Sequence, residues 1–169
     1  QWLSQGESRL TAAELDNQGD WQGDRITAGV ERLRNAGQLL GLSAMTLTVN
    51  DALTNSVTGR LLTSGAAVLS AATAENDGEW QAGRLLLTAD RLRNGGRIAS
   101  DGELRITLPT ADDALRRPSR RAARQVAPDM QAAALATGSL SNSGTLTAGG
   151  ELSLTGGAIT NAGRLDSRT

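Results

Sequence analysis

The sequence repeats one short phrase, an aliphatic residue followed by x-Asn-x-Gly, at intervals of about twenty residues. A large apolar residue stands four positions after six of the asparagines, as Trp21 follows Asn17, whereas Leu61 follows Asn55 two positions late. Such self-similarity is typical of a solenoid, in which each short coil packs against the next. The asparagines are Asn17, Asn35, Asn55, Asn76, Asn94, Asn142 and Asn161, separated by 18, 20, 21, 18, 48 and 19 residues.

Polar and apolar residues alternate over short stretches between these corners, as in Thr46-Leu47-Thr48-Val49. Alternation rich in Thr, Val and Ile predicts strands, here of three to five residues bounded by Gly, Asn, Asp or Ser. A unit this short cannot bury its own apolar side chains, so we expect an all-β fold, a parallel β-helix. Leucine-rich repeats share the period, but their strand-to-asparagine spacing and return helix are absent.

Residues at equivalent positions of neighbouring coils should lie one strand spacing apart, roughly 4.8 Å. The position before the asparagine pairs Asp16 with Arg34 and Glu75 with Arg93, opposite in sign both times. Three residues after the asparagine, Glu79 precedes Arg97 of the next coil. We expect the asparagines themselves to form a hydrogen-bonded ladder of side-chain amides, with Asn and Gly supplying left-handed backbone at each corner.

Several residue types are absent from the sequence, and this excludes many classes of enzyme mechanism. The chain has no Cys and no His, and all 17 basic residues are Arg. Disulfides, zinc fingers, Ser-His-Asp triads and lysine Schiff bases are therefore excluded, and we expect no metal and no cofactor. A net charge of −1 argues against nucleic-acid binding. No apolar run is long enough to span a membrane, and the start at Gln1 predicts an internal fragment of a longer protein.

The repeat is interrupted once, between Asn94 and Asn142, by a segment that contains all three prolines. We expect β-helical repeats over 1–109, an irregular or helical insertion over 110–138 and the same solenoid continuing over 139–169. The insertion is predicted to be a loop with one or two short helices, or a degenerate coil. Its arginines are either a solvated face or a contact patch for an acidic partner. They are Arg116, Arg117, Arg120, Arg121 and Arg124.

The phrase Leu-x-Asn-x-Gly-x-Leu/Trp, followed by Gly-x-Leu-x-Leu-Thr, resembles the repeats of filamentous-haemagglutinin-type exoproteins. This family includes Bordetella-type haemagglutinin and the contact-dependent growth-inhibition effectors, and the resemblance covers residues 1 to 109 and 139 to 169. It implies a right-handed β-helical rod on the surface of a Gram-negative bacterium, secreted by two-partner secretion through an outer-membrane transporter. It also implies a host or neighbouring-cell surface receptor or glycan as partner.

A structural role as a rod or stalk is therefore the leading hypothesis for function. The first alternative is that this piece is itself the receptor- or host-binding segment, since the basic interruption could form a contact surface. The second is a carbohydrate-active enzyme, because some enzymes of this kind are parallel β-helices. That alternative requires clustered carboxylates, whereas the predicted columns place Arg or Thr beside most acids. We predict no catalysis.

Overall fold

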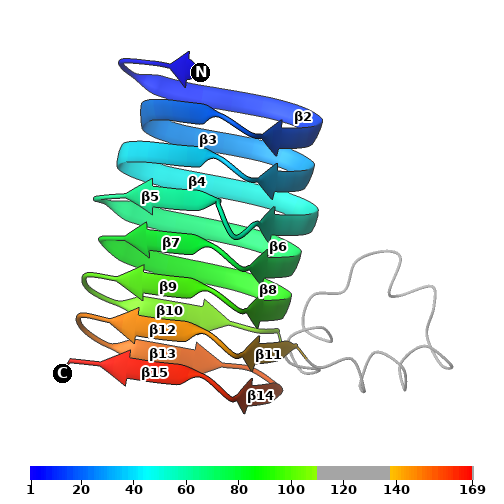
Figure 1. Ribbon diagram of the computed structural model, residues 1–169, viewed down its shortest axis with the longest axis vertical. Coiled ribbons are helices and arrows are strands. Elements are labelled where there is room, and N and C mark those ends of the chain that lie inside the picture. The colour runs from blue at the N-terminus through cyan, green and yellow to red at the C-terminus, as the bar shows by residue number, and fades with distance from the viewer. Residues whose placement is uncertain (110–137, 169) are drawn as a thin grey trace, which may run out of the picture.

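The computed structural model describes residues 1–109 and 138–168, and within them the chain forms strands and turns without any helix. The strands pair in parallel and stack along one axis, with the N-terminus at one end and the C-terminus at the other (Figure 1). Each coil ends at one of the seven asparagines, which gives seven coils followed by one last strand. The expectation of an all-β parallel solenoid is confirmed.

A coil has three segments: the first follows the Asn-x-Gly corner, the second follows a bend, and the third ends at the next asparagine. Some strands cover one segment and others run through two or three. The strands are β1 (Trp2–Leu3), β2 (Glu7–Asn17), β3 (Asp20–Asn35), β4 (Gln38–Asn55), β5 (Arg60–Thr63), β6 (Ala66–Asn76), β7 (Glu79–Ala82), β8 (Arg84–Asn94), β9 (Arg97–Ser100), β10 (Leu104–Thr107), β11 (Ser139–Asn142), β12 (Thr145–Ala148), β13 (Leu152–Thr155), β14 (Ala158–Asn161) and β15 (Arg164–Ser167).

Nine of the fifteen strands among the described residues have four residues, as the alternation predicts, whereas β2, β3, β4, β6 and β8 are longer and run through two or three segments. Strand β4 has 18 residues and β3 has 16, and each passes through all three segments of its coil. The backbone keeps its hydrogen bonds to the adjacent coil through the bends, and the register shifts between β3 and β4 fall there, at Gly23/Arg25 and Val30/Arg32. Alternation marks the straight parts of a strand, whereas a bend interrupts the alternation without ending the ladder.

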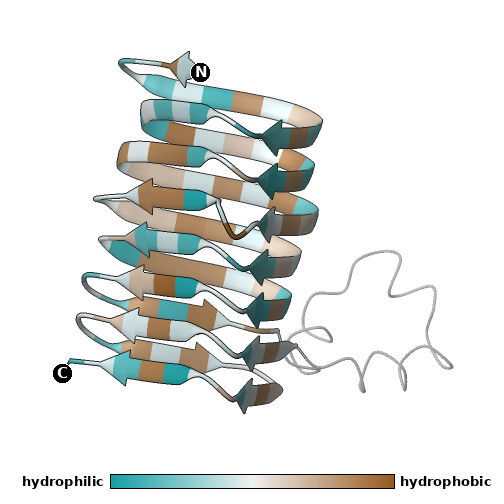
Figure 2. Ribbon diagram, viewed as in Figure 1, coloured by the Kyte–Doolittle hydropathy of each residue, from teal (hydrophilic) through white to brown (hydrophobic). Residues whose placement is uncertain are grey.

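Apolar side chains of successive coils stack in columns inside the solenoid. Hydrophobic and hydrophilic residues alternate along many of the strands (Figure 2). In the first segments, Trp21 pairs with Leu39, and the column continues through five more residues. These are Leu61, Trp80, Ile98, Leu146 and Leu165. Burying a leucine or isoleucine fully contributes about 1.5–3 kcal/mol, so these columns dominate the stability of the solenoid.

The late position of Leu61 is explained by a longer corner after Asn55. Val57 points into solvent and is 79% exposed. Gly59 donates its backbone N–H to the carbonyl of Ser56 at 2.8 Å, and the Thr58 hydroxyl donates to the carbonyl of Ala36 at 2.8 Å. The extra residues therefore bulge outward, and Leu61 returns to the column in register with Leu39.

The strands on either side of residues 110–137 belong to one coil, which packs directly between the coils before and after it. Strand β10 pairs with β8 on one side and β13 on the other, and β11 pairs with β8 and β14. Among the described residues no other coil comes between these neighbours, whereas residues 110–137, for which a loop with short helices or a degenerate coil is predicted, lie outside the described ranges. Pro109 and Gly138, at the two edges of the described ranges, are joined by a hydrogen bond from the Gly138 N–H to the Pro109 carbonyl at 2.8 Å.

Candidate functional site

The structure brings the seven asparagine side chains together in one row along the solenoid axis. The Nδ2 of each asparagine donates to the Oδ1 of the asparagine in the following coil, at 2.7–2.8 Å in all six links. The link from Asn94 to Asn142 has the same length as the others, although 48 residues separate the two in sequence. Asn35 through Asn142 are buried, whereas Asn17 is half-buried and Asn161 is exposed.

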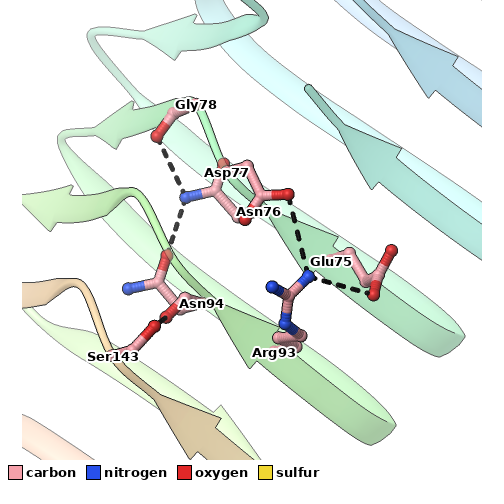
Figure 3. A network of polar contacts seen from close by, with 7 residues as sticks. All are labelled: Glu75, Asn76, Asp77, Gly78, Arg93, Asn94 and Ser143. Atoms are coloured by element: carbon pink, nitrogen blue, oxygen red, sulfur yellow. Dashed lines mark hydrogen bonds and ion pairs between the residues drawn. The ribbon is translucent and has the colours of Figure 1, made fainter. Parts of the chain in front are cut away.

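Each amide also satisfies backbone carbonyls at the corner. Asn76 donates to the Gly78 carbonyl at 3.2 Å (Figure 3). It also donates to the Arg97 carbonyl of the next coil at 3.0 Å. A buried carbonyl without a donor costs about 1–3 kcal/mol, and the side-chain amide is the group that reaches these carbonyls where the chain turns. Asparagine fits because its side chain both donates and accepts.

The corner glycines are explained by close stacking, and the expected left-handed backbone is wrong. No residue in 1–109 or 138–168, glycine or other, has a positive φ. A Cβ at Gly37 would instead overlap the carbonyl oxygen of Gly19, and a Cβ at Gly96 would overlap that of Gly78. The Asn-x-Gly phrase therefore places a residue without a side chain where one coil's backbone presses on the next.

Charged columns cover the outside of the solenoid. Arg93 lies 3.4 Å from Glu75 (Figure 3) and Arg97 lies 3.8 Å from Glu79. Both pairs were predicted from the opposite charges at equivalent positions of neighbouring coils. Asp16 and Arg34 are also in register, but Asp16 accepts a hydrogen bond from Gln18. Exposed pairs of this kind contribute about 0–1 kcal/mol each, so their main effect is to favour one register over another.

Glu103 lies between two arginines at the start of a second segment. Its carboxylate is 2.6 Å from Arg84 of the preceding coil and 2.7 Å from Arg105 of its own coil. The hydrogen bond from Arg84 lowers the pKa of the Glu103 carboxyl, with further lowering from the charges of Arg105 and Arg84. This arrangement keeps the carboxylate ionised and paired, which suits a link between coils and not a proton donor.

The three tryptophans differ in their surroundings. Trp21 and Trp80 are buried in the first-segment column, but Trp2 is 48% exposed, because no coil of this chain covers it, and it stacks on Trp21 at 5.2 Å. The Trp21 indole N–H donates to the buried Ser8 hydroxyl at 2.7 Å. The Trp80 Nε1 is buried with no hydrogen-bond partner. Ser8 was not predicted from sequence, although it is a lone serine in a column with Ile26, Met45, Ala67 and Leu85.

Over 1–109 and 138–168, no three acidic residues are grouped so as to hold a metal ion. No helix that could cross a membrane was found among the described residues. The candidate contact patch of Arg116, Arg117, Arg120, Arg121 and Arg124 lies outside the described residues.

Comparison with known proteins places the repeat among bacterial exoproteins. The family described as haemagglutinin repeat matches residues 3–108 and 127–168. The deoxyribonuclease CdiA of Dickeya dadantii strain 3937 is 69% identical over 156 residues, which is 92% of this chain and 5% of that protein. The toxin CdiA of Escherichia coli is 41% identical over 78 residues, or 46% of this chain and 2% of that protein.

A third relative, the 16S rRNA endonuclease CdiA of Enterobacter cloacae, is 33% identical over 106 residues, or 63% of this chain and 3% of that protein. The chain thus spans at most about one-twentieth of the length of these relatives. No solved structure matches it.

Proposed function

The chain belongs to the haemagglutinin-repeat family, being similar to the repeat region of CdiA-type exoproteins, and we propose that it acts as a rod segment within a larger surface protein. Its role is mechanical: it provides reach and presents a surface, without catalysis. The observation that carries this proposal is the parallel stacking of seven coils around one axis, held by the asparagine row.

The mechanism converts sequence length into distance. Each coil adds one strand spacing, roughly 4.8 Å, to the rod. The backbone groups of one coil are satisfied by the next, so every coil serves as the template for its neighbour and the stack does not bend freely. A stack of coils can therefore hold the distal part of a protein at a fixed distance from the point where the protein is attached.

The absence of catalysis is supported by where the acidic residues lie. Glu75, Glu79 and Glu103 each contact an arginine of an adjacent coil. Where a second carboxylate is near, as Asp77 is to Glu75, both lie against the same arginine. The nuclease names of the relatives describe proteins of which this chain matches one-twentieth or less. We assign the rod role to this segment and no nuclease role.

The cellular location and the partners that we propose for such a rod follow from the family. We propose that the parent protein is secreted to the surface of a Gram-negative cell through an outer-membrane transporter, and that a receptor or glycan on a host or neighbouring cell is its partner. The division into 1–109, 110–138 and 139–169 remains a prediction, in which 110–138 is an excursion from one coil.

A coil-insertion experiment tests the rod. Three copies of the coil 77–94, inserted after Asn94, keep the repeat period and should lengthen the particle by roughly 14 Å while it remains folded. The matched control inserts one and a half copies, which displaces every later column by half a coil and should unfold the C-terminal part. Small-angle X-ray scattering measures the length and circular dichroism the fold. A folded three-copy variant of unchanged length would refute the rod.

A further inference from the structure

The outer face of the third segments, formed by the outward-pointing residues before each asparagine, is hollowed near the N-terminal end. Two adjoining hollows of about 280 and 340 Å³ share Asp16, Arg34 and Thr54 in their walls. They form because Ala52 and Thr54 of the third coil are short, whereas Arg32 and Arg34 of the second coil are long and stand beside them in register. We call this pair of hollows the Arg34 groove.

Arg34 differs from Arg93, the other arginine of its column, because its charge is not paired. Over 1–109 and 138–168 the Arg34 guanidinium makes no hydrogen bond or ion pair, and the Thr54 hydroxyl likewise has no partner. Other arginines on the described surface also have unpaired charges, among them Arg25, Arg60 and Arg91. Arg93 occupies the same column three coils later and pairs with Glu75 and Asp77. An unpaired guanidinium presents up to five N–H donors in a planar fork that fits a carboxylate.

The other walls of the groove indicate what must accompany that carboxylate. Two acidic residues line the groove. Glu14 is 2.6 Å from Arg32, which pairs its charge. Asp16 stands beside Arg34 in register, where it repels a bare anion but accepts hydrogen bonds from hydroxyls. Gln18 and Thr54 contribute an amide and a hydroxyl. The apolar lining is limited to Leu15 and the small Ala36 and Ala52, so a peptide would find no pocket for a large side chain.

We propose that the Arg34 groove binds an acidic saccharide, with the carboxylate of a uronic acid on Arg34 and its ring hydroxyls on Asp16 and Thr54. A ligand of this class carries both a carboxylate that can pair with Arg34 and hydroxyl groups that can donate hydrogen bonds to Asp16. This inference goes beyond the rod function, which stands whether or not the groove is occupied, because Arg34 links no coil to another.

The experiment compares two arginines of one column in the full chain. Trigalacturonate is titrated by calorimetry into wild type, Arg34→Gln and Arg93→Gln, and the side-chain amide resonance of Gln18 reports the location by NMR. Arg34→Gln should weaken binding about ten- to a hundredfold, the usual worth of a hydrogen-bonded charge, while Arg93→Gln leaves it unchanged. Both variants should melt within a few degrees of wild type, since neither arginine is buried.

A second pair of variants separates shape from charge. Ala52→Leu fills the groove and should abolish binding, whereas Thr73→Leu, at the equivalent position of the next coil and outside the groove, should not. Maltotriose and triglutamate are the neutral and peptide probes. Equal binding of either probe, equal loss in Arg93→Gln, or no saturable binding of trigalacturonate up to about 10 mM would overturn the proposal.

Discussion

The middle coils and the two end coils of the solenoid carry the same repeated phrase but differ in what covers them. In the middle, Asn76 accepts a hydrogen bond from Asn55, donates one to Asn94 and is fully buried. At the C-terminal end, Asn161 still accepts from Asn142 but donates only to the nearby Gly163 carbonyl, and it is exposed. The same residue type in the same phrase thus has different physical surroundings.

This difference teaches that the environment of a residue in a solenoid is set by the coils above and below it. Gly19 and Gly96 end the same Asn-x-Gly phrase, yet the only atom near an added Cβ at Gly19 is the Gln1 nitrogen at 3.9 Å. At Gly96 the same Cβ would overlap backbone of the preceding coil. Substitutions should therefore be judged by column and by position along the axis, not by the repeat alone.

The largest difference between middle and end is expected for Asn76→Asp against Asn161→Asp. At position 76 a buried carboxylate would face the oxygens of Asn94, Gly78 and Arg97 without a proton to donate. This should reduce the free energy of unfolding by about 3–5 kcal/mol, the usual cost of an uncompensated buried charge. At position 161 the carboxylate still accepts from Asn142 and is solvated, so the loss should stay below about 1 kcal/mol.

Urea denaturation followed by circular dichroism measures both variants. Asn76→Ala separates the charge from the missing amide, and it should fall between Asn76→Asp and wild type, with a loss of about 1–3 kcal/mol. Equal losses at positions 76 and 161 would contradict the view that neighbouring coils determine the contribution of each asparagine.

The second comparison uses the corner glycines. Gly96→Ala should reduce the free energy of unfolding by about 1–3 kcal/mol, because its Cβ forces two coil backbones apart, whereas Gly19→Ala should be within about 0.5 kcal/mol of wild type. Thermal melting of the two variants checks this. Since neither glycine has a positive φ, a comparable loss at Gly19 would point to a backbone effect instead of stacking.

The fold could be predicted from sequence because the repeat fixes it at several independent positions. The asparagine spacing, the apolar residue after each corner and the Glu75–Arg93 and Glu79–Arg97 columns all require the same register. The backbone conformation of the corner could not be predicted, since Asn and Gly are favoured both by left-handed turns and by close stacking. Only the position of the preceding coil distinguishes these two causes.

The groove was harder to predict than the columns. Ala52, Thr54, Arg32 and Arg34 are unremarkable in sequence, and the hollow arises from a difference in side-chain length between neighbouring coils. Opposite charges in register predict an ion pair between Asp16 and Arg34, whereas in the structure Asp16 accepts a hydrogen bond from Gln18 and Arg34 has no partner among the described residues. Opposite charge in a column predicts the register but does not decide which side chains pair.

The smallest expected effect concerns the two buried tryptophans, which occupy one column but have different neighbours. Ser8 stands thirteen positions before Trp21, and the corresponding position before Trp80 is Ala67, which is buried in the same column as Ser8. Ala67→Ser should supply the acceptor that the Trp80 N–H lacks and raise the free energy of unfolding by about 0.5–1.5 kcal/mol. Ser8→Ala should lower it by a similar amount by removing the partner of Trp21.

Chemical denaturation measures both, and the wavelength of tryptophan fluorescence in a Trp2→Leu background reports the polarity around each indole. A destabilised Ala67→Ser would mean that the hydroxyl cannot reach Nε1, and that the geometry around Trp21 does not recur three coils later.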